Sequence, residues 1–401
     1  MQLKNVTIVL PDGVYQNSAM SAKDGIITEI EKGEKLSEFP TGLVVIPGLV
    51  DLHGDMLERE LEPRPTSRFP VEMALDELDK RHVASGITTA YVALSFADFA
   101  ERDDDLRLNT RMIEVVEAVV SRRDSLSCDT RVHARFEIMN PEAAPLLETM
   151  IAKKQVEMVS LMDHTPGQGQ FRDLENYVLY MMKWLKVGRD AAQKELERQM
   201  SQPKTWESVQ EICRLATAHG LPVASHDDDT EAKVSLMREL GVTISEFPVS
   251  LEAVRTAKAN GMHTLMGAPN ALRGRSHSGN LSAIEALKCQ QLDALSSDYY
   301  PAAILHATFG LAYKGLAPLH ETVKLVSQNP ALAARLSNKG SLEIGKDADV
   351  VMIHSGLAPR VAATFRAGRM VYWAGDTLPV VELAQSTVTK KSGIPLLAFI
   401  K

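Results

Sequence analysis

Residues 44–65 read VVIPGLVDLHGDMLERELEPRP, and this stretch contains the first clear sign of the protein's architecture. An apolar run with the character of a buried strand ends abruptly in His53-Gly54-Asp55. In an extended segment, residues i and i+2 point to the same side, so His53 and Asp55 can reach one ion. Imidazole and carboxylate groups are ligands that zinc-type divalent ions take. The pair is either a metal clamp at a strand end or an ordinary polar strand end.

Further apolar, strand-like runs follow the first one and alternate with helical patterns such as AVRTAKAN and SLMREL. Near-continuous apolar strands that alternate with helices indicate a parallel sheet, and about eight of them predict a (β/α)8 TIM-like barrel. The runs, in chain order, are GLVDLHGD, ITTAYVALSF, RVHARFEI, VEMVSLMDHTP, LPVASHDDD, VTISEFP, MHTLMGAPN and DALSSDYYP.

The two ends of the chain have a different character. The N-terminal runs KNVTIVL and SAMSAKDGIITEIEKG contain turn signals, with Asp24-Gly25 typical of a hairpin. The same pattern of short strand-like runs with turn signals occurs near the other end, in GSLEIGKDADVVMIH and VAATFRAGRMVYWAG. Each segment is too small to bury a core of its own. We therefore predict an α/β protein with a barrel over residues 48–340, a small β-sandwich from residues 1–47 and 341–380, and a C-terminal tail at 381–401.

Composition limits the classes of protein that fit. The 401 residues are 45% hydrophobic and carry a formal net charge of −8, which argues against nucleic-acid binding but leaves room for a small anionic substrate. The three widely spaced cysteines fit a reduced, cytoplasmic protein. No window resembles a signal peptide or a membrane span. The amphipathic stretch 171–205 predicts helices that pack on the barrel, with a lid or a dimer contact as the alternatives.

Polar residues stand at the ends of several predicted strands, which is the catalytic face of a barrel. A single histidine or aspartate there is more often structural than a ligand, but six together favour a catalytic metal site. His133 is left out because it lies inside a strand, and Glu246 ends another strand without an assigned role. The predicted metal ligands are His53, Asp55, Glu137, His164, His226 and Asp298.

Two further segments could meet the same face of the barrel. The stretch MGAPNALRGRSHSGN, residues 266–280, offers glycines, arginines and hydroxyls that suit an anion with several oxygens, although a solvated polar loop fits equally well. In SHDDDT, residues 225–230, the acidic residues either contact a metal or substrate hydroxyl or begin a helix. The predicted substrate-binding residues are Arg64, Arg273, Arg275, Ser276, His277 and Asp228.

Over nearly its whole length the chain resembles the amidohydrolase superfamily, through IPGLVDLHGD near the start and GSLEIGKDADVVMI near the end. Five longer motifs resemble one branch, the α-D-ribose 1-methylphosphonate 5-triphosphate diphosphatases of the carbon–phosphorus lyase pathway. They are HGDMLERELEPRP, VSLMDHTPGQGQF, ASHDDDT, GAPNALRGRSHSGN and LSSDYYPA. The branch carries His-x-Asp where most amidohydrolases carry His-x-His, with Thr-Asp-Asn expected where this chain has Gly54-Asp55-Met56.

The resemblance implies hydrolysis of a ribose 5-triphosphate bearing a 1-phosphonate to the 5-phosphate and pyrophosphate. It further implies one or two divalent ions, Zn²⁺ above Mn²⁺ or Fe²⁺, with Glu137 as a bridging carboxylate and Asp298 as the general base. A homodimer is expected, because this arrangement is common in the superfamily. The main alternative is hydrolysis of a C–N bond by a deacylase or deaminase. The arginines argue against it, since neutral substrates do not need them.

Overall fold

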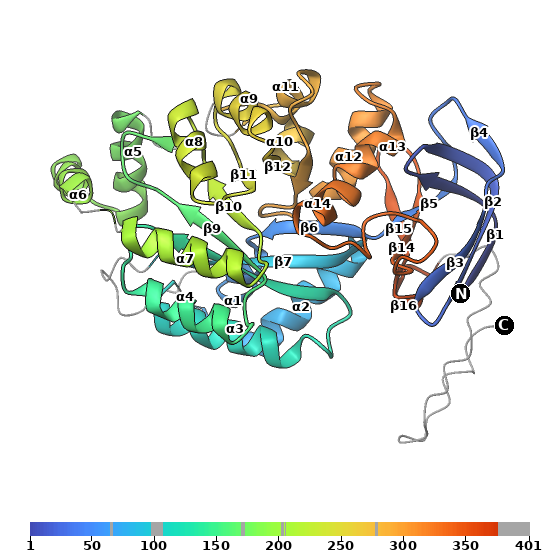
Figure 1. Ribbon diagram of the computed structural model, residues 1–401, viewed down its shortest axis with the longest axis horizontal. Coiled ribbons are helices and arrows are strands. Elements are labelled where there is room, and N and C mark those ends of the chain that lie inside the picture. The colour runs from blue at the N-terminus through green and yellow to red at the C-terminus, as the bar shows by residue number, and fades with distance from the viewer. Residues whose placement is uncertain are drawn as a thin grey trace.

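The computed structural model describes residues 1–64, 67–97, 107–169, 173–201, 204, 206–276 and 280–375. Figure 1 shows a barrel in the middle of the molecule, a second sheet at one end and a helical hairpin at the other. The predicted fold class, a (β/α)8 barrel with a β-sandwich built from both chain ends, is confirmed. The predicted C-terminal tail lies outside the described residues.

The barrel strands occur in the predicted number and order. Each strand pairs in parallel with the next one along the chain. All carboxyl ends therefore lie at one edge of the sheet, which gathers the polar strand ends seen in the sequence. The strands are β6 (Leu49–Gly54), β7 (Ile87–Phe96), β8 (Asp129–Glu137), β9 (Met158–Met162), β10 (Val223–His226), β11 (Ile244–Glu246), β12 (His263–Gly267) and β13 (Ala294–Ser296).

Helices cover the outside of this sheet (Figure 1). Among the described residues α1 follows β6 directly, with Asp55 between strand and helix. The helices around the barrel are α1 (Met56–Leu61), α2 (Val71–Ala84), α3 (Asn109–Arg122), α4 (Ala143–Ala152), α7 (Trp206–Ala218), α8 (Glu231–Glu239), α9 (Leu251–Ala259), α10 (Ala268–Arg273), α11 (Ala283–Lys288), α12 (Ala303–Tyr313), α13 (Leu319–Lys324) and α14 (Gln328–Ala333).

The inside of the barrel is a packed apolar core. Leu52, Tyr91, Met158 and Leu265 come from different strands and meet in one cluster. Ala331 of α14 packs against the same cluster. Because these side chains fill the lumen, a substrate can approach only from the carboxyl edge of the strands.

The barrel closes where its first and last strands meet. The backbone N–H of Asp298 donates to the carbonyl of His53 at 2.9 Å, and the N–H of Asp55 donates to the carbonyl of Asp298 at 2.8 Å. Below these bonds, the buried Asp51 carboxylate accepts from the Ser297 backbone N–H at 2.9 Å and from its hydroxyl at 2.5 Å. We call this contact the seam. It fixes His53, Asp55 and Asp298 relative to one another through the main chain.

The second sheet joins the two ends of the chain. Its strands run in the order β16-β15-β14-β5-β1-β2-β3, with β4 paired to β2, and only β1 and β5 among them pair in parallel. The predicted hairpin at Asp24-Gly25 is present, and both residues have positive φ, as a two-residue turn requires. The strands are β1 (Gln2–Leu10), β2 (Gly13–Lys23), β3 (Ile26–Glu31), β4 (Glu34–Leu36), β5 (Leu43–Pro47), β14 (Val350–His354), β15 (Arg360–Arg366) and β16 (Arg369–Trp373).

The predicted helical stretch forms a hairpin of α5 (Leu174–Leu185) and α6 (Arg189–Ser201) at the end of the molecule opposite the second sheet (Figure 1). Tyr177, Met181 and Leu196 pack in an apolar cluster between the two helices. The expectation that this apolar face packs on the barrel is therefore wrong. None of the described helices is both long and apolar enough to span a bilayer.

Candidate functional site

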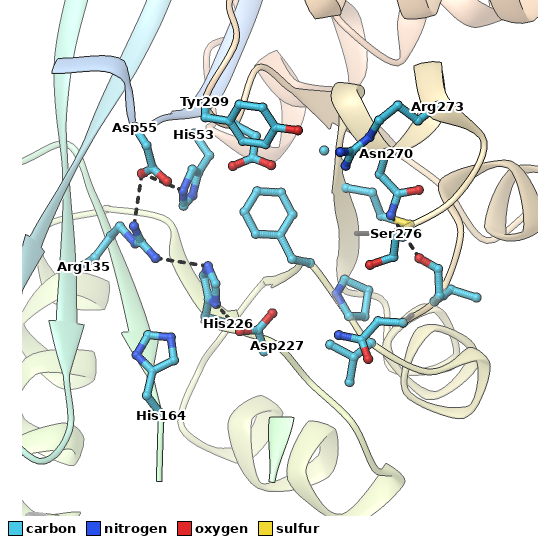
Figure 2. Close-up of a pocket in the computed structure, with 18 of the residues that line it drawn as sticks. His53, Asp55, Arg135, His164, His226, Asp227, Asn270, Arg273, Ser276 and Tyr299 are labelled. Atoms are coloured by element: carbon cyan, nitrogen blue, oxygen red, sulfur yellow. Dashed lines mark hydrogen bonds and ion pairs between the residues drawn. The ribbon is translucent and has the colours of Figure 1, made fainter. Parts of the chain in front are cut away.

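A cavity of about 530 Å³ opens at the carboxyl edge of the barrel strands (Figure 2). Five of the six predicted ligands line it, and the sixth, Glu137, is buried behind them. The lining residues are His53, Asp55, Arg59, Arg135, His164, His226, Asp227, Phe247, Pro248, Val249, Met266, Gly267, Asn270, Arg273, Ser276, Asn280, Leu281, Asp298 and Tyr299.

His53 stands between two carboxylates. Its Nδ1 lies 2.8 Å from Oε1 of Glu246, and its Nε2 lies 3.2 Å from Oδ1 of Asp55. Burial opposes a charge on the ring, but Glu246 and Asp55 outweigh this effect and raise the pKa of His53 to about 10. Glu246 is itself fully buried, and its pKa is lowered to about 2 because His53 outweighs the effect of burial. Glu246 had no assigned role, and here it is the partner of the first-strand histidine.

His133 completes a buried set beneath the cavity. Its Nδ1 lies 3.0 Å from the carbonyl of Leu52, to which it donates, and burial lowers its pKa to about 3. The ring is therefore neutral, and its buried Nε2 has no hydrogen-bond partner among the described residues. One ligand atom each from His53, His133 and Glu246 lies within 4.8 Å of the others. We call these three residues the floor group.

A second group of potential metal ligands lines the cavity. Nδ1 of His164 lies 2.7 Å from Oε2 of Glu137, an arrangement that turns the opposite ring nitrogen toward the open side. Nδ1 of His226 lies 3.0 Å from Oδ2 of Asp227. His164, His226 and Asp227 offer ligand atoms within 4.8 Å of one another, and we call them the cavity group.

The cavity group suits a divalent ion by its chemistry. Nδ1 of His226 and Oδ2 of Asp227 are both buried, and among the described residues neither has a partner in hydrogen-bond geometry. Two imidazoles and a carboxylate are a ligand set for a zinc-type ion with an open position. Glu137 would then support His164 from behind, in place of the bridging role that the resemblance implied.

Asp298 lines the cavity directly after β13. Its backbone is held in the left-handed region, with φ of 56°, by the bonds of the seam. Burial, together with the nearby Asp55 carboxylate, raises the pKa of Asp298 to about 6. At neutral pH this carboxylate is mostly ionised and can accept a proton, as a general base must.

The structure places the predicted substrate-binding residues differently. Arg273 and Ser276 line the cavity, whereas Arg64 and Arg275 are exposed and lie outside its lining. Asp228 is fully buried and accepts from the hydroxyls of Ser225 and Ser245, both at 2.6 Å, so it braces the strands beneath the cavity. His277 lies outside the described residues.

Two arginines outside the predicted set of binding residues line the cavity. Arg59 on α1 stacks over Tyr299, with its guanidinium carbon 5.9 Å from the ring centre. It follows Asp55 by four residues, one helical turn, and this spacing was the available signal. Arg135 on β8 donates to Oδ1 of Asp55 at 3.0 Å and to Nε2 of His226 at 3.3 Å (Figure 2).

Known proteins share the sequence pattern and the fold of this chain. Alpha-D-ribose 1-methylphosphonate 5-triphosphate diphosphatase from Escherichia coli (strain K12) is 37% identical over 363 residues, which cover 88% of this chain and 95% of that protein. Among solved structures, 5-methylcytosine deaminase from Klebsiella pneumoniae superposes with a TM-score of 0.62 at 15% identity, covering 95% of this chain and 100% of the other.

Dihydropyrimidinase from Brevibacillus agri gives a TM-score of 0.60 at 13% identity, covering 93% of this chain and 95% of the other. At these identities the two structures establish the fold only. The profile of the amidohydrolase family matches residues 44–371, which span most of the chain. The resemblance seen in the sequence is confirmed, and the chain belongs to the amidohydrolase family and is a hydrolase.

Proposed function

We propose that the protein is a metal-dependent hydrolase that converts a ribose 5-triphosphate bearing a 1-phosphonate to the 5-phosphate and pyrophosphate. The observation that carries this proposal is the composition of the cavity, where histidines and carboxylates share one space with Arg59 and Arg273. The name of the Escherichia coli relative supports the same substrate class. Hydrolysis of a neutral C–N substrate would leave both arginines without a function.

The two arginines suit a polyphosphate. Both side chains are exposed at the cavity wall. Arg59 stacks on Tyr299, and Nε of Arg273 donates to the carbonyl of Pro269 at 3.2 Å, so both guanidinium groups are positioned to meet an incoming anion. Guanidinium forks bind phosphate oxygens through two parallel hydrogen bonds. Asn270 and Ser276 line the cavity with them and add polar contacts. We assign Arg59 and Arg273 to the phosphates that leave as pyrophosphate.

The cavity group would hold a divalent ion, with Zn²⁺ favoured and Mn²⁺ or Fe²⁺ as alternatives. Such an ion acidifies a water molecule and draws charge from a phosphoryl oxygen. Glu137 holds the His164 ring in the orientation that ligation needs.

Asp298 would take the proton of the attacking water on its carboxylate. Its raised pKa lies closer to neutrality than that of an ordinary aspartate, which favours proton transfer in both directions. The reaction adds one water across the anhydride between the first and second phosphates. The bridging oxygen leaves with pyrophosphate, and the first phosphate stays on the sugar.

The test is release of pyrophosphate by the purified protein. We expect the Mn²⁺- or Zn²⁺-loaded protein to release one pyrophosphate per molecule of ribose 1-methylphosphonate 5-triphosphate, measured with a coupled enzyme assay. Chelator-treated protein should release none until the metal is restored.

Dihydropyrimidine and N-acyl compounds serve as competing substrates in parallel assays. Turnover of one of these without release of pyrophosphate would replace the proposal by C–N bond hydrolysis. Pyrophosphate release that persists in chelator-treated protein would contradict the metal dependence.

A further inference from the structure

A tight turn after β13 presents two neighbouring side chains to the cavity. The backbone N–H of Tyr300 donates to the carbonyl of Ser297 at 3.0 Å. Asp298 and Tyr299 are therefore the two central residues of a four-residue turn, and both line the cavity. Asp298 has a φ of 56°, which a residue other than glycine adopts only at a cost in free energy. The chain thus accepts backbone strain at the point where it directs both side chains into one space.

The seam holds this turn in place. Asp298 donates from its backbone N–H to the carbonyl of His53 at 2.9 Å and accepts from the N–H of Asp55 at 2.8 Å. The ring of Tyr299 is covered by the guanidinium of Arg59, whose carbon lies 5.9 Å from the ring centre. The carboxylate assigned as general base and the phenol beside it are therefore fixed relative to each other before a substrate arrives.

The hydroxyl of Tyr299 is available to a substrate. It makes no hydrogen bond within the part of the chain that the structure describes. Figure 2 shows the hydroxyl oxygen on the side of the ring that faces Arg273. The amide of Asn270, another donor at the cavity wall, is already engaged, because its Nδ2 donates to the carbonyl of Leu281 at 3.0 Å. A phenol O–H is a hydrogen-bond donor, and a bound anion would give it a partner.

The proposed reaction needs a donor in this part of the cavity. In an in-line displacement, the attacking water and the leaving oxygen lie on opposite sides of the first phosphorus atom, and Asp298 serves the water. Arg59 and Arg273 are assigned to the departing phosphates, but negative charge also develops on the bridging oxygen as its bond to the first phosphorus breaks. Arg59 covers the ring of Tyr299 and Arg273 lies on the side of its hydroxyl, so this hydroxyl lies among the groups assigned to the leaving pyrophosphate.

We propose that the hydroxyl of Tyr299 donates a hydrogen bond to the bridging oxygen that leaves with pyrophosphate, which makes Tyr299 a further catalytic residue. In this step the water oxygen bonds to the first phosphorus, and the bond from that phosphorus to the bridging oxygen breaks. The electron pair of the broken bond stays on the bridging oxygen. Asp298 takes the proton of the water, and the phenol keeps its own proton. The role of this hydroxyl rests on the proposed function, because it concerns the oxygen that leaves in that reaction.

Tyr299→Phe removes only the hydroxyl and keeps the ring on which Arg59 stacks. We expect kcat for pyrophosphate release to fall roughly 10- to 100-fold while KM changes less than about threefold, because the lost hydrogen bond is strongest in the transition state. Tyr300→Phe is the matched control, since this side chain is 58% exposed and does not line the cavity, and we expect wild-type kinetics. Equal kinetics of the two variants, or a Tyr299→Phe protein that changes only in KM, would overturn the proposal.

The basicity of the leaving group separates a catalytic hydroxyl from a structural one. Two substrate analogues carry CH₂ or CF₂ in place of the oxygen between the second and third phosphates, so that the leaving bisphosphonate is more basic or less basic. A donor to the leaving oxygen matters more when that oxygen is more basic, so Tyr299→Phe should slow the CH₂ analogue at least about threefold more than the CF₂ analogue in single turnovers.

The same factor for both analogues would show that Tyr299 acts only on the structure, and would overturn the proposal. If the wild type releases neither pyrophosphate nor bisphosphonate, the proposed function is wrong, and this role of Tyr299 is lost with it. If the wild type releases both and Tyr299→Phe releases them at the same rates, only the role of Tyr299 is wrong.

Discussion

For single residues, the alternation of side chains between the two faces of a strand was the most informative pattern for predicting the site. It identified His53 and Asp55 as a pair, and Glu137, His164, His226 and Asp298 as strand-end residues, and the structure brings these around one cavity. Alternation could not tell which strand-interior residues reach the site, because that depends on neighbouring strands. His133 and Glu246 meet His53 only through contacts between segments far apart in the chain.

Gly54 was unexplained by the sequence. A Cβ at this position would lie 3.2 Å from Oγ of Ser297 and 3.3 Å from Oδ2 of Asp51, both at the seam. Any larger side chain would press on the hydrogen bond between those two groups. In this chain, glycine therefore fits the way the first strand meets the last.

The arginines at the cavity provide a prediction at this scale. Arg59→Ala and Arg273→Ala should each lower kcat/KM for the triphosphate roughly 10- to 100-fold, because each loses charge-assisted hydrogen bonds worth about 1.5–3 kcal/mol. Arg64→Ala and Arg275→Ala are the matched controls, since these exposed side chains do not line the cavity. Steady-state kinetics of pyrophosphate release would measure all four, and equal losses in both pairs would refute the assignment of Arg59 and Arg273.

At the scale of the element, the barrel strands were predictable because each is an apolar run ended by polar residues. The short helix α1 was not, because its MLEREL sequence begins directly at the strand end. Asp55 stands at its N-cap position, but its side chain makes no capping hydrogen bond and contacts His53 and Arg135 instead. This helix turns Arg59 toward the cavity and leaves Arg64 outside it. The packing of α5 on α6 could not be predicted from the sequence either. An amphipathic pattern shows that one face of a helix is buried, but it does not identify the element that covers this face.

Helix α2 provides a prediction of pH dependence. It carries the buried His82, whose pKa burial lowers to about 4, and at its end the Thr364 hydroxyl donates to the carbonyl of Val83 at 2.7 Å. The unfolded chain takes up a proton at His82 below about pH 6.5, whereas the folded chain does so only near pH 4. Stability therefore falls as the pH drops through this window, by about 2–3 kcal/mol from His82 between pH 6.5 and 4.5.

We expect His82→Leu to lose about 2–3 kcal/mol less stability than the wild type over that interval, as measured by urea unfolding at pH 7.5 and pH 4.5. His219→Gln, which changes an exposed histidine, should behave like the wild type. Parallel loss of stability in the wild type and His82→Leu would show that His82 does not carry the effect.

At the scale of the whole molecule, the pairing of the two chain ends was predictable because neither end could bury a core alone. How the sheet so formed is attached to the barrel was not. Lys339 is 8% exposed and lies 2.8 Å from Asp349, 3.1 Å from Asp347 and 3.8 Å from Asp129. Asp129 begins β8 of the barrel, and Asp349 directly precedes β14 of the second sheet. One buried ammonium thus ties the two sheets together.

Removing this ammonium should destabilise the whole molecule. Lys339→Met keeps the apolar stem but removes the cation that Asp347 and Asp349 share, while Asp129 keeps Arg131 at 3.0 Å. We expect a loss of about 3–5 kcal/mol in the free energy of unfolding. Lys346→Met, which removes a partly exposed ion pair to Glu343 at 3.0 Å, should cost less than about 1 kcal/mol. Denaturant unfolding compares the two, and similar costs would contradict the role of Lys339.

The seam has a consequence for how the protein fails on heating. The bonds that close the barrel are also the bonds that hold His53 and Asp55 against Asp298. Any breathing motion that parts the first strand from the last dismantles the active centre at the same moment, while the surrounding helices stay packed. Inactivation therefore requires only a local opening of the barrel, and we expect activity to be lost at temperatures below that of global unfolding.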